Sequence, residues 1–110
     1  MNVSVRVIDG IYGRPAVGVP VELSRDVNGA FVTQWQEQTD DDGRISSLRT
    51  SPLTTGAYRL EFDLDGYFRA LGYASLNSAI GVRFFLASQN QHYALSLLIT
   101  PTSCTTFKDD

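Results

Sequence analysis

The sequence contains a single cysteine, Cys104, and a single histidine, His92. A lone cysteine excludes an intrachain disulfide and a cysteine-cluster metal site. Zinc is usually held by several cysteine or histidine side chains, so this composition also argues against a zinc site of the ordinary kind. We therefore expect the protein to use neither a metal nor another cofactor.

Long apolar runs and concentrated positive charge are also missing. The longest apolar runs are far shorter than the roughly 20 residues that span a bilayer. The start, MNVSVRVID, lacks the basic and apolar regions of a secretory signal. The formal net charge is −3 with both signs interspersed, so no basic stripe is available to contact phosphates. These absences predict a cytoplasmic protein that binds neither nucleic acid nor a membrane.

The chain has 110 residues, 43% of them hydrophobic, which suits one compact domain over residues 1–110. Short segments of alternating apolar and polar residues dominate, and no long segment has helical periodicity. Val3, Val5 and Val7 form the apolar face of a first strand. Further strands are expected at 17–23, 31–38, 44–48, 57–62, 80–86, 93–100 and 104–108.

Turn and helix signals separate these strands. Gly13-Arg14-Pro15 predicts a turn, and Asn28-Gly29 predicts a tight hairpin because both residues tolerate positive φ. Pro20 suggests a sheet edge or a bulge early in the second strand. A short helix is expected from Asp65, as its cap, through Leu71, ended by Gly72. Eight short strands with one brief helix indicate an all-β sandwich.

Several motifs, in order along the whole chain, resemble one family. They are the opening VSVRVID, the turn Gly13-Arg14-Pro15-Ala16, the segments 39–45, 55–60 and 66–68, and the ending QHYALSLLITPTSCTTFKDD. On these motifs the chain is identified as a member of the transthyretin and 5-hydroxyisourate hydrolase family. The resemblance implies a transthyretin-like (prealbumin-like) β-sandwich of two four-stranded sheets. It also implies a homotetramer, a dimer of dimers, with small-molecule sites in a channel between subunits.

The positions that carry the family's chemistry differ in this chain. The hydrolases open a strained ring by adding water, and two histidines suit the proton transfers that this needs. Arg6 stands where the opening strand of the family has the first histidine, and Ala94 stands in place of the second. Phe107-Lys108-Asp109-Asp110 replaces the family's terminal Tyr-Arg-Gly-Ser. The scaffold motifs are kept and the reactive side chains are not.

Arg44 and Arg6 are the candidate catalytic cations. Arg44 keeps the family's Asp-Gly-Arg setting, in which the resemblance implies a planar donor fork facing the ligand. The alternative is an ordinary surface arginine after a turn. Arg6 cannot shuttle protons near neutral pH, but it suits an anion or a developing negative charge. Its alternative role is a salt bridge to Asp109 or Asp110.

His92 and Asp110 are the candidate proton-transfer groups. His92 lies on the same strand face as Ala94, displaced from it by about 7 Å, and a structural role at the rim is the alternative. A carboxylate of Asp110 beside Arg6 would be a weak base, whereas one partly buried beside its two-fold mate would be a stronger one. Alternatively, the acidic tail is frayed.

The candidate substrate-binding residues are Arg44, Ala94, Ser96, Lys108 and Asp109. Ala94 leaves space where an imidazole would stand, and Ser96 replaces a family proline. Lys108 keeps the charge of the family's terminal arginine without its bidentate geometry. Asp109 adds a carboxylate where a small neutral residue is usual.

Three functions are compatible with this pattern. The first is a small-molecule enzyme turned to another substrate, with ring opening, ring closure or tautomerisation of a carbonyl-bearing heterocycle as its reaction. The second is a ligand-binding tetramer without catalysis, as transthyretin itself is, favoured by the lack of a well-placed base. The third, 5-hydroxyisourate hydrolysis, has the least support because both histidines lack equivalents.

Overall fold

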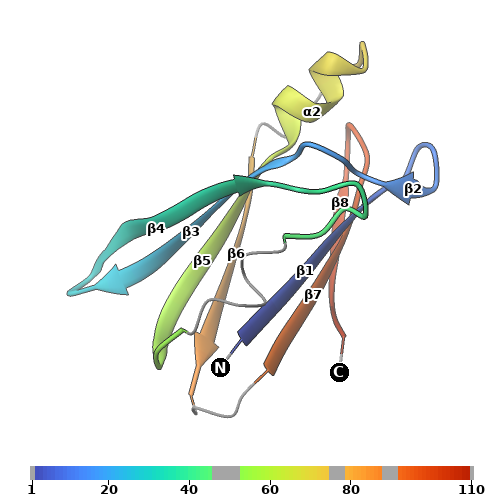
Figure 1. Ribbon diagram of the computed structural model, residues 1–110. Helices are drawn as coiled ribbons and strands as arrows, with labels where there is room; N and C mark the ends of the chain where they lie inside the picture. The colour runs from blue at the N-terminus through green and yellow to red at the C-terminus, as the bar shows by residue number, and fades with distance from the viewer. Residues whose placement is uncertain (1, 46–52, 75–78, 88–91, 110) are drawn as a thin grey trace.

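The computed structural model describes residues 2–45, 53–74, 79–87 and 92–109, with the side chains of residues 2, 92 and 107–109 left out. Its strands form two four-stranded sheets, with the orders β2-β1-β7-β8 and β4-β3-β5-β6 (Figure 1). The first sheet comprises β1 (Asn2–Asp9), β2 (Arg14–Pro15), β7 (His92–Ile99) and β8 (Cys104–Asp109). The second comprises β3 (Pro20–Val27), β4 (Ala30–Gln38), β5 (Gly56–Asp63) and β6 (Ala79–Leu86). The predicted two-sheet sandwich is confirmed.

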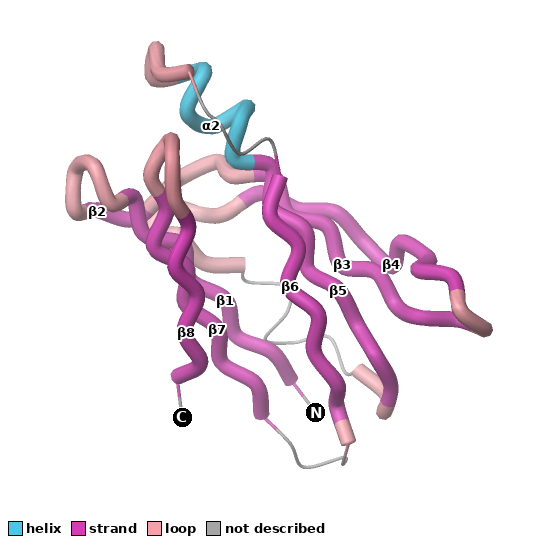
Figure 2. The backbone as a smooth tube through the Cα atoms, turned by 180° about the vertical axis from the view of Figure 1, so that it is seen from behind, coloured by secondary structure: helices cyan, strands magenta, loops and turns pink. Residues whose placement is uncertain are grey.

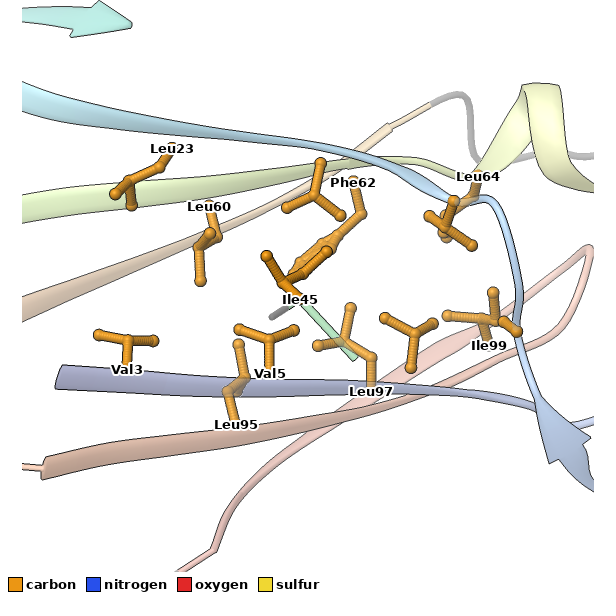
Figure 3. Close-up of a cluster of buried hydrophobic side chains, with 14 of the residues drawn as sticks. Val3, Val5, Leu23, Ile45, Leu60, Phe62, Leu64, Leu95, Leu97 and Ile99 are labelled. Atoms are coloured by element: carbon orange, nitrogen blue, oxygen red, sulfur yellow. The ribbon is translucent and has the colours of Figure 1, made fainter. Parts of the chain in front are cut away.

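The core lies between the two sheets, where every second residue of the central strands points inward (Figure 3). Val3, Val5 and Val7 of β1 are buried, as predicted from their alternation. Strand β1 pairs with β7 in parallel, so that Val5 lies opposite Leu95. Other buried members of the core are Leu23, Ile45, Leu60, Phe62, Leu97 and Ile99. Because odd-numbered residues of β1 face the core, its even-numbered residues lie on the outer face of the sheet.

The hairpin at Asn28-Gly29 is confirmed. Their φ angles are 54° and 89°, which is the pattern of a two-residue turn that matches strand twist. The sheet edge or early bulge suggested by Pro20 is wrong on both counts. Pro20 begins β3, which lies between β4 and β5, and the register between β3 and β4 shifts later, between Leu23 and Ser24. A proline at the first strand position leaves no ladder donor missing.

Two other boundaries differ from the prediction. The second strand was expected from Val17, but Val17 is exposed and Gly18 has a φ of 79°, which breaks the extended run before Pro20. Arg14 and Pro15 were expected in a turn, yet they form β2, paired with Asp9 and Ile8. Periodicity alone did not reveal so short a strand.

The helix α2 (Leu64–Ala70) starts earlier than predicted. Its N-cap is Asp63, whose side chain accepts from the Gly66 N–H at 3.2 Å. The expected cap, Asp65, instead lies in the first turn and pairs with Arg69. Strand β5 therefore runs directly into the helix, which ends before Gly72 as predicted. No helix in the described residues is long and apolar enough to cross a bilayer.

The strand expected at 44–48 is present only at its first residue. Arg44 forms an isolated antiparallel bridge with Arg6 of β1. Residue 45 carries no strand assignment, and residues 46–48 lie outside the described residues.

A buried carboxylate joins helix α2 to the end of β1. Asp9 is fully buried, and its Oδ2 accepts a hydrogen bond from the Tyr67 hydroxyl at 2.7 Å. Burial, together with this hydrogen bond to a carboxylate, raises the pKa of Tyr67 above its ordinary value near 10. The unfolded chain thus releases the Tyr67 proton more readily than the folded one. This difference favours folding up to about pH 10 and is lost as the pH rises further.

Replacement of Tyr67 by phenylalanine should lower the free energy of unfolding by about 1–3 kcal/mol at neutral pH, because Asp9 Oδ2 loses its donor. The decline of stability above about pH 10 should also be shallower than in the wild type. Urea unfolding at neutral and alkaline pH measures both. Tyr73→Phe, which removes an exposed hydroxyl, is the matched control and should change stability far less. Equal losses in the two variants would contradict this role of Asp9.

Candidate functional site

Arg6 and Arg44 come together where the chain crosses from β4 to the edge of the first sheet (Figure 1). The Val7 N–H donates to the Gly43 carbonyl at 2.8 Å, and the Ala16 N–H donates to the Val7 carbonyl at 2.9 Å. Ile45 is buried in the core directly after Arg44. The two arginines are thus neighbours on the outer face, as the sequence led us to expect for a shared site.

A tight turn fixes the backbone of Arg44. Asp40 Oδ1 accepts from the backbone N–H groups of Asp42 and Arg44, each at 2.9 Å. Gly43 has a φ of 73°, and a Cβ there would lie 2.4 Å from the Val7 carbonyl oxygen. Only glycine meets both conditions. The Asp-Gly-Arg motif is therefore a structural requirement of the turn as well as the source of a cation.

The paired arginines lie in a surface hollow of about 450 Å³. Its lining residues are Arg6, Ile8, Gly13, Arg14, Pro15, Asp42 and Arg44. None of the three arginines takes part in an ion pair within the described part of the chain. Guanidinium groups without carboxylate partners in a concave surface attract an anion or polarise a carbonyl oxygen.

Sequence reasoning missed two of the charged lining residues, Arg14 and Asp42. Both lie in motifs that carry the family resemblance, so their positions were visible in the sequence. The sequence does not reveal that the pairing of β2 with β1 places Arg14 of the Gly-Arg-Pro-Ala motif near Asp42 of segment 39–45. Among the lining residues only Asp42 offers a carboxylate as a proton acceptor, and it is exposed.

Ser96 of β7 lies beside Arg6, and Ala94 lies two residues further along the same pair of strands. In the parallel register Ser96 is opposite Arg6 and Ala94 is opposite Ser4. Their neighbours Leu95 and Leu97 are buried in the core, so Ala94 and Ser96 belong to the outer face. Ser96 is nonetheless only 1% exposed. A row thus crosses the sheet from Arg44 through Arg6 to Ser96.

The remaining predicted site residues are placed by strand register alone. Asp109 lies opposite Ala94. Lys108 lies opposite Leu95, whose side chain faces the core, so its position alternates with that of Asp109. His92 is opposite Asn2 at the start of β7, two residues from Ala94. Asp110 lies outside the described residues.

A larger hollow, of about 540 Å³, lies on the other sheet. Its lining includes Glu22, Glu37, Glu61 and Asp63, which would repel an anionic ligand. Hydrogen bonds from the side chains of Thr33 and Gln36 lower the pKa of Glu22, so this carboxylate already has partners within the sheet. No group of three metal-binding side chains occurs in the residues described. The smaller, cationic hollow is therefore the better candidate.

The sandwich of two four-stranded sheets is that of a transthyretin-like protein. The chain belongs to the HIUase/Transthyretin family, whose profile matches residues 3–109. It is 34% identical to 5-hydroxyisourate hydrolase of Halalkalibacterium halodurans, with 97% of this chain and 96% of that protein covered.

Two solved structures are similar to the fold. One is sea bream transthyretin in complex with thyroxine, at a TM-score of 0.92 and 29% identity, with 99% of this chain and 95% of that one covered. The other is Klebsiella pneumoniae 5-hydroxyisourate hydrolase, at a TM-score of 0.82 and 28% identity, with coverages of 99% and 93%. The family identified from the sequence motifs is thus confirmed.

The replacement Gly43→Ala should destabilise the protein by at least about 3 kcal/mol, because it adds a clash with the Val7 carbonyl to the cost of positive φ. Gly13→Ala is the matched control: its φ is 66°, but nothing lies within 4 Å of an added Cβ. It should cost only about 1 kcal/mol. Thermal or urea unfolding measures the difference. Similar losses for both variants would show that the Val7–Gly43 contact does not hold the turn.

Proposed function

We propose that this protein is a small-molecule enzyme of the family whose substrate is a carbonyl-bearing heterocycle other than 5-hydroxyisourate. The observation that carries the proposal is the hollow in which Arg6 and Arg44 lie side by side without ion-pair partners among the described residues. Two adjacent guanidiniums repel each other, so the arrangement gains most from a bound anion. Ring opening, ring closure and tautomerisation all develop negative charge on an oxygen.

In this proposal Arg6 and Arg44 hold that oxygen or a carboxylate of the substrate. The strand bridge holds their backbones next to each other before the reaction, and groups that are already in place stabilise developing charge most effectively. Because arginine remains protonated near neutral pH, neither can move the proton. That task falls to another side chain, and the candidates are the carboxylate of Asp42 in the hollow, the carboxylate of Asp110 and the imidazole of His92. Asp109, Ser96, Ala94 and Lys108 complete the proposed binding surface.

The change of substrate is supported by what replaces the two family histidines. Arg6 occupies the position of one, on β1, and Ala94 occupies that of the other, on β7. Neither replacement can act as a general base. The relatives named as 5-hydroxyisourate hydrolases support an enzymatic ancestry, and the replaced residues support a different reaction.

The proposal includes assembly as a homotetramer, a dimer of dimers, with each site in a channel between subunits. Strands β6 and β8 each lie at one end of their sheets (Figure 2), and unpaired sheet edges favour pairing with another chain. Large apolar side chains are exposed on β6 and on β7: Phe85 is 62% exposed and Leu98 is 39% exposed. Isologous contacts that include the edge strands and the outer face of β7 would cover both. Residues 1–110 would form one domain of a cytoplasmic protein.

A second candidate function is ligand binding without catalysis. It is favoured by the greater likeness to sea bream transthyretin, which was solved in complex with thyroxine, than to the Klebsiella hydrolase (TM-scores 0.92 and 0.82). The lack of a histidine, cysteine or lysine among the residues lining the hollow points the same way. Recovery of a bound heterocycle unchanged after prolonged incubation would favour this function over the first.

The binding step can be tested on one ring system. Comanate is γ-pyrone, a neutral ring with one ketone, to which one carboxylate has been added. Calorimetric titration should show comanate binding at least about tenfold more tightly than γ-pyrone, because the carboxylate contacts Arg6 and Arg44. Arg44→Gln should remove this advantage.

Arg69→Gln is the matched control, since Arg69 lies on α2 in an exposed pair with Asp65. It should bind comanate as the wild type does. Equal binding of comanate and γ-pyrone by the wild type, or a comanate affinity that Arg44→Gln leaves intact, would contradict the proposed site.

A further inference from the structure

We infer that Arg14 is a specificity-determining residue that selects ligands carrying a second acidic group. This inference rests on the proposed function, because it concerns the same hollow, and goes beyond it by naming the ligand class as dianionic. Arg14 lines the hollow from strand β2, Arg6 lines it from strand β1, and Arg44 lines it from the segment after β4 that bridges to β1. The hollow therefore has cations from three different backbone segments.

The charge of the lining supports a dianion. Three arginines and one aspartate line the hollow among the residues that the structure describes, so three positive charges less one negative charge leave two positive charges. None of these arginines is neutralised by an ion pair within the described residues. A ligand with one carboxylate at Arg6 and Arg44 would leave one positive charge facing it. A second acidic group on the same ring would balance that charge.

Arg14 directly follows a turn whose backbone is held by several hydrogen bonds. The carboxylate of Asp9 accepts from the backbone N–H groups of Ile11 and Tyr12, at 2.8 and 3.2 Å. The Gly13 N–H donates to the Asp9 carbonyl at 2.8 Å, and Gly13 has a φ of 66°. Arg14 itself pairs with Asp9 across β1 and β2. The carboxylate and the backbone carbonyl of the buried Asp9 thus hold the backbone of this turn.

The side chain of Arg14 is also placed. Its guanidinium lies over the Tyr12 ring, 4.6 Å from the ring centroid, which orients it without neutralising its charge. The Tyr12 hydroxyl in turn hydrogen-bonds with that of Tyr73 at 3.0 Å. Tyr67 binds the other oxygen of Asp9. Contacts from α2 and the residues after it therefore hold the turn and the stacking partner of Arg14, and a pre-oriented cation loses less entropy on binding.

Chelidonate, which is γ-pyrone with two carboxylates, tests this inference against comanate, which has one. The wild type should bind chelidonate about tenfold more tightly than comanate, as calorimetry at low ionic strength will measure. In Arg14→Gln the advantage of chelidonate should fall to within about twofold, while the affinity for comanate stays within about twofold of wild type. Thermal unfolding of this variant should match the wild type, because Arg14 is exposed.

Two variants separate the possible failures. Arg44→Gln should weaken both ligands, and Arg69→Gln should keep the wild-type preference for chelidonate. A preference that survives Arg14→Gln, or that Arg69→Gln also removes, would overturn the role of Arg14. Comanate binding that depends on Arg44, with no preference for chelidonate, would overturn this inference alone. Failure of comanate to bind better than γ-pyrone would overturn the proposed function itself.

Discussion

The contact between the Val7 N–H and the Gly43 carbonyl is the constraint on which the site depends. It connects the turn that follows β4 of the second sheet to strand β1 of the first sheet. The approach is so close that only glycine fits at position 43, and the next residue, Arg44, is thereby set against Arg6. Burial of Ile45 in the core holds the other side of the turn. The core and the cationic hollow are thus positioned by the same few residues.

A scaffold of this kind separates stability from chemistry. Apart from Asp9, the described side chains of β1 and β7 that face inward are apolar and belong to the core, whereas most of those that face outward are not part of it. Arg6 and Ala94 are outward residues, so the exchange of histidines that we propose at these positions leaves the sandwich intact. A new ligand specificity can therefore arise on an unchanged fold. The turn before Arg14 shows the same separation: the buried Asp9 holds the backbone of the turn, and the exposed Arg14 supplies the charge.

Much of the fold could be predicted because its signals are local. Alternation along β1 revealed the core face, and Asn28-Gly29 revealed the hairpin through its need for positive φ. The predictions were wrong where contacts between distant parts of the chain set the bounds of an element. Asp63 caps the helix because β5 runs straight into it, and this continuity is not visible in the spacing around Asp65. Strand β2 exists only because Arg14 and Pro15 meet the end of β1.

The candidate site was predicted less completely. The motifs indicated Arg6 and Arg44 as the cations, and the structure places them side by side. Arg14 and Asp42 were missed because their proximity to this pair comes from the crossing of two turns, not from any sequence spacing. On β8, Lys108 lies opposite Leu95 and Asp109 lies opposite Ala94. These partners depend on the register with β7, which the sequence does not reveal.

The central claim is that the family's fold is retained while its reaction is replaced, and hydrolysis of freshly generated 5-hydroxyisourate tests it most directly. Decay of substrate absorbance would be followed with this protein, with an authentic 5-hydroxyisourate hydrolase and with buffer alone. The account predicts decay equal to the buffer blank, since Arg6 and Ala94 supply no general base. Decay well above the blank would contradict it and would require a substitute base in the hollow.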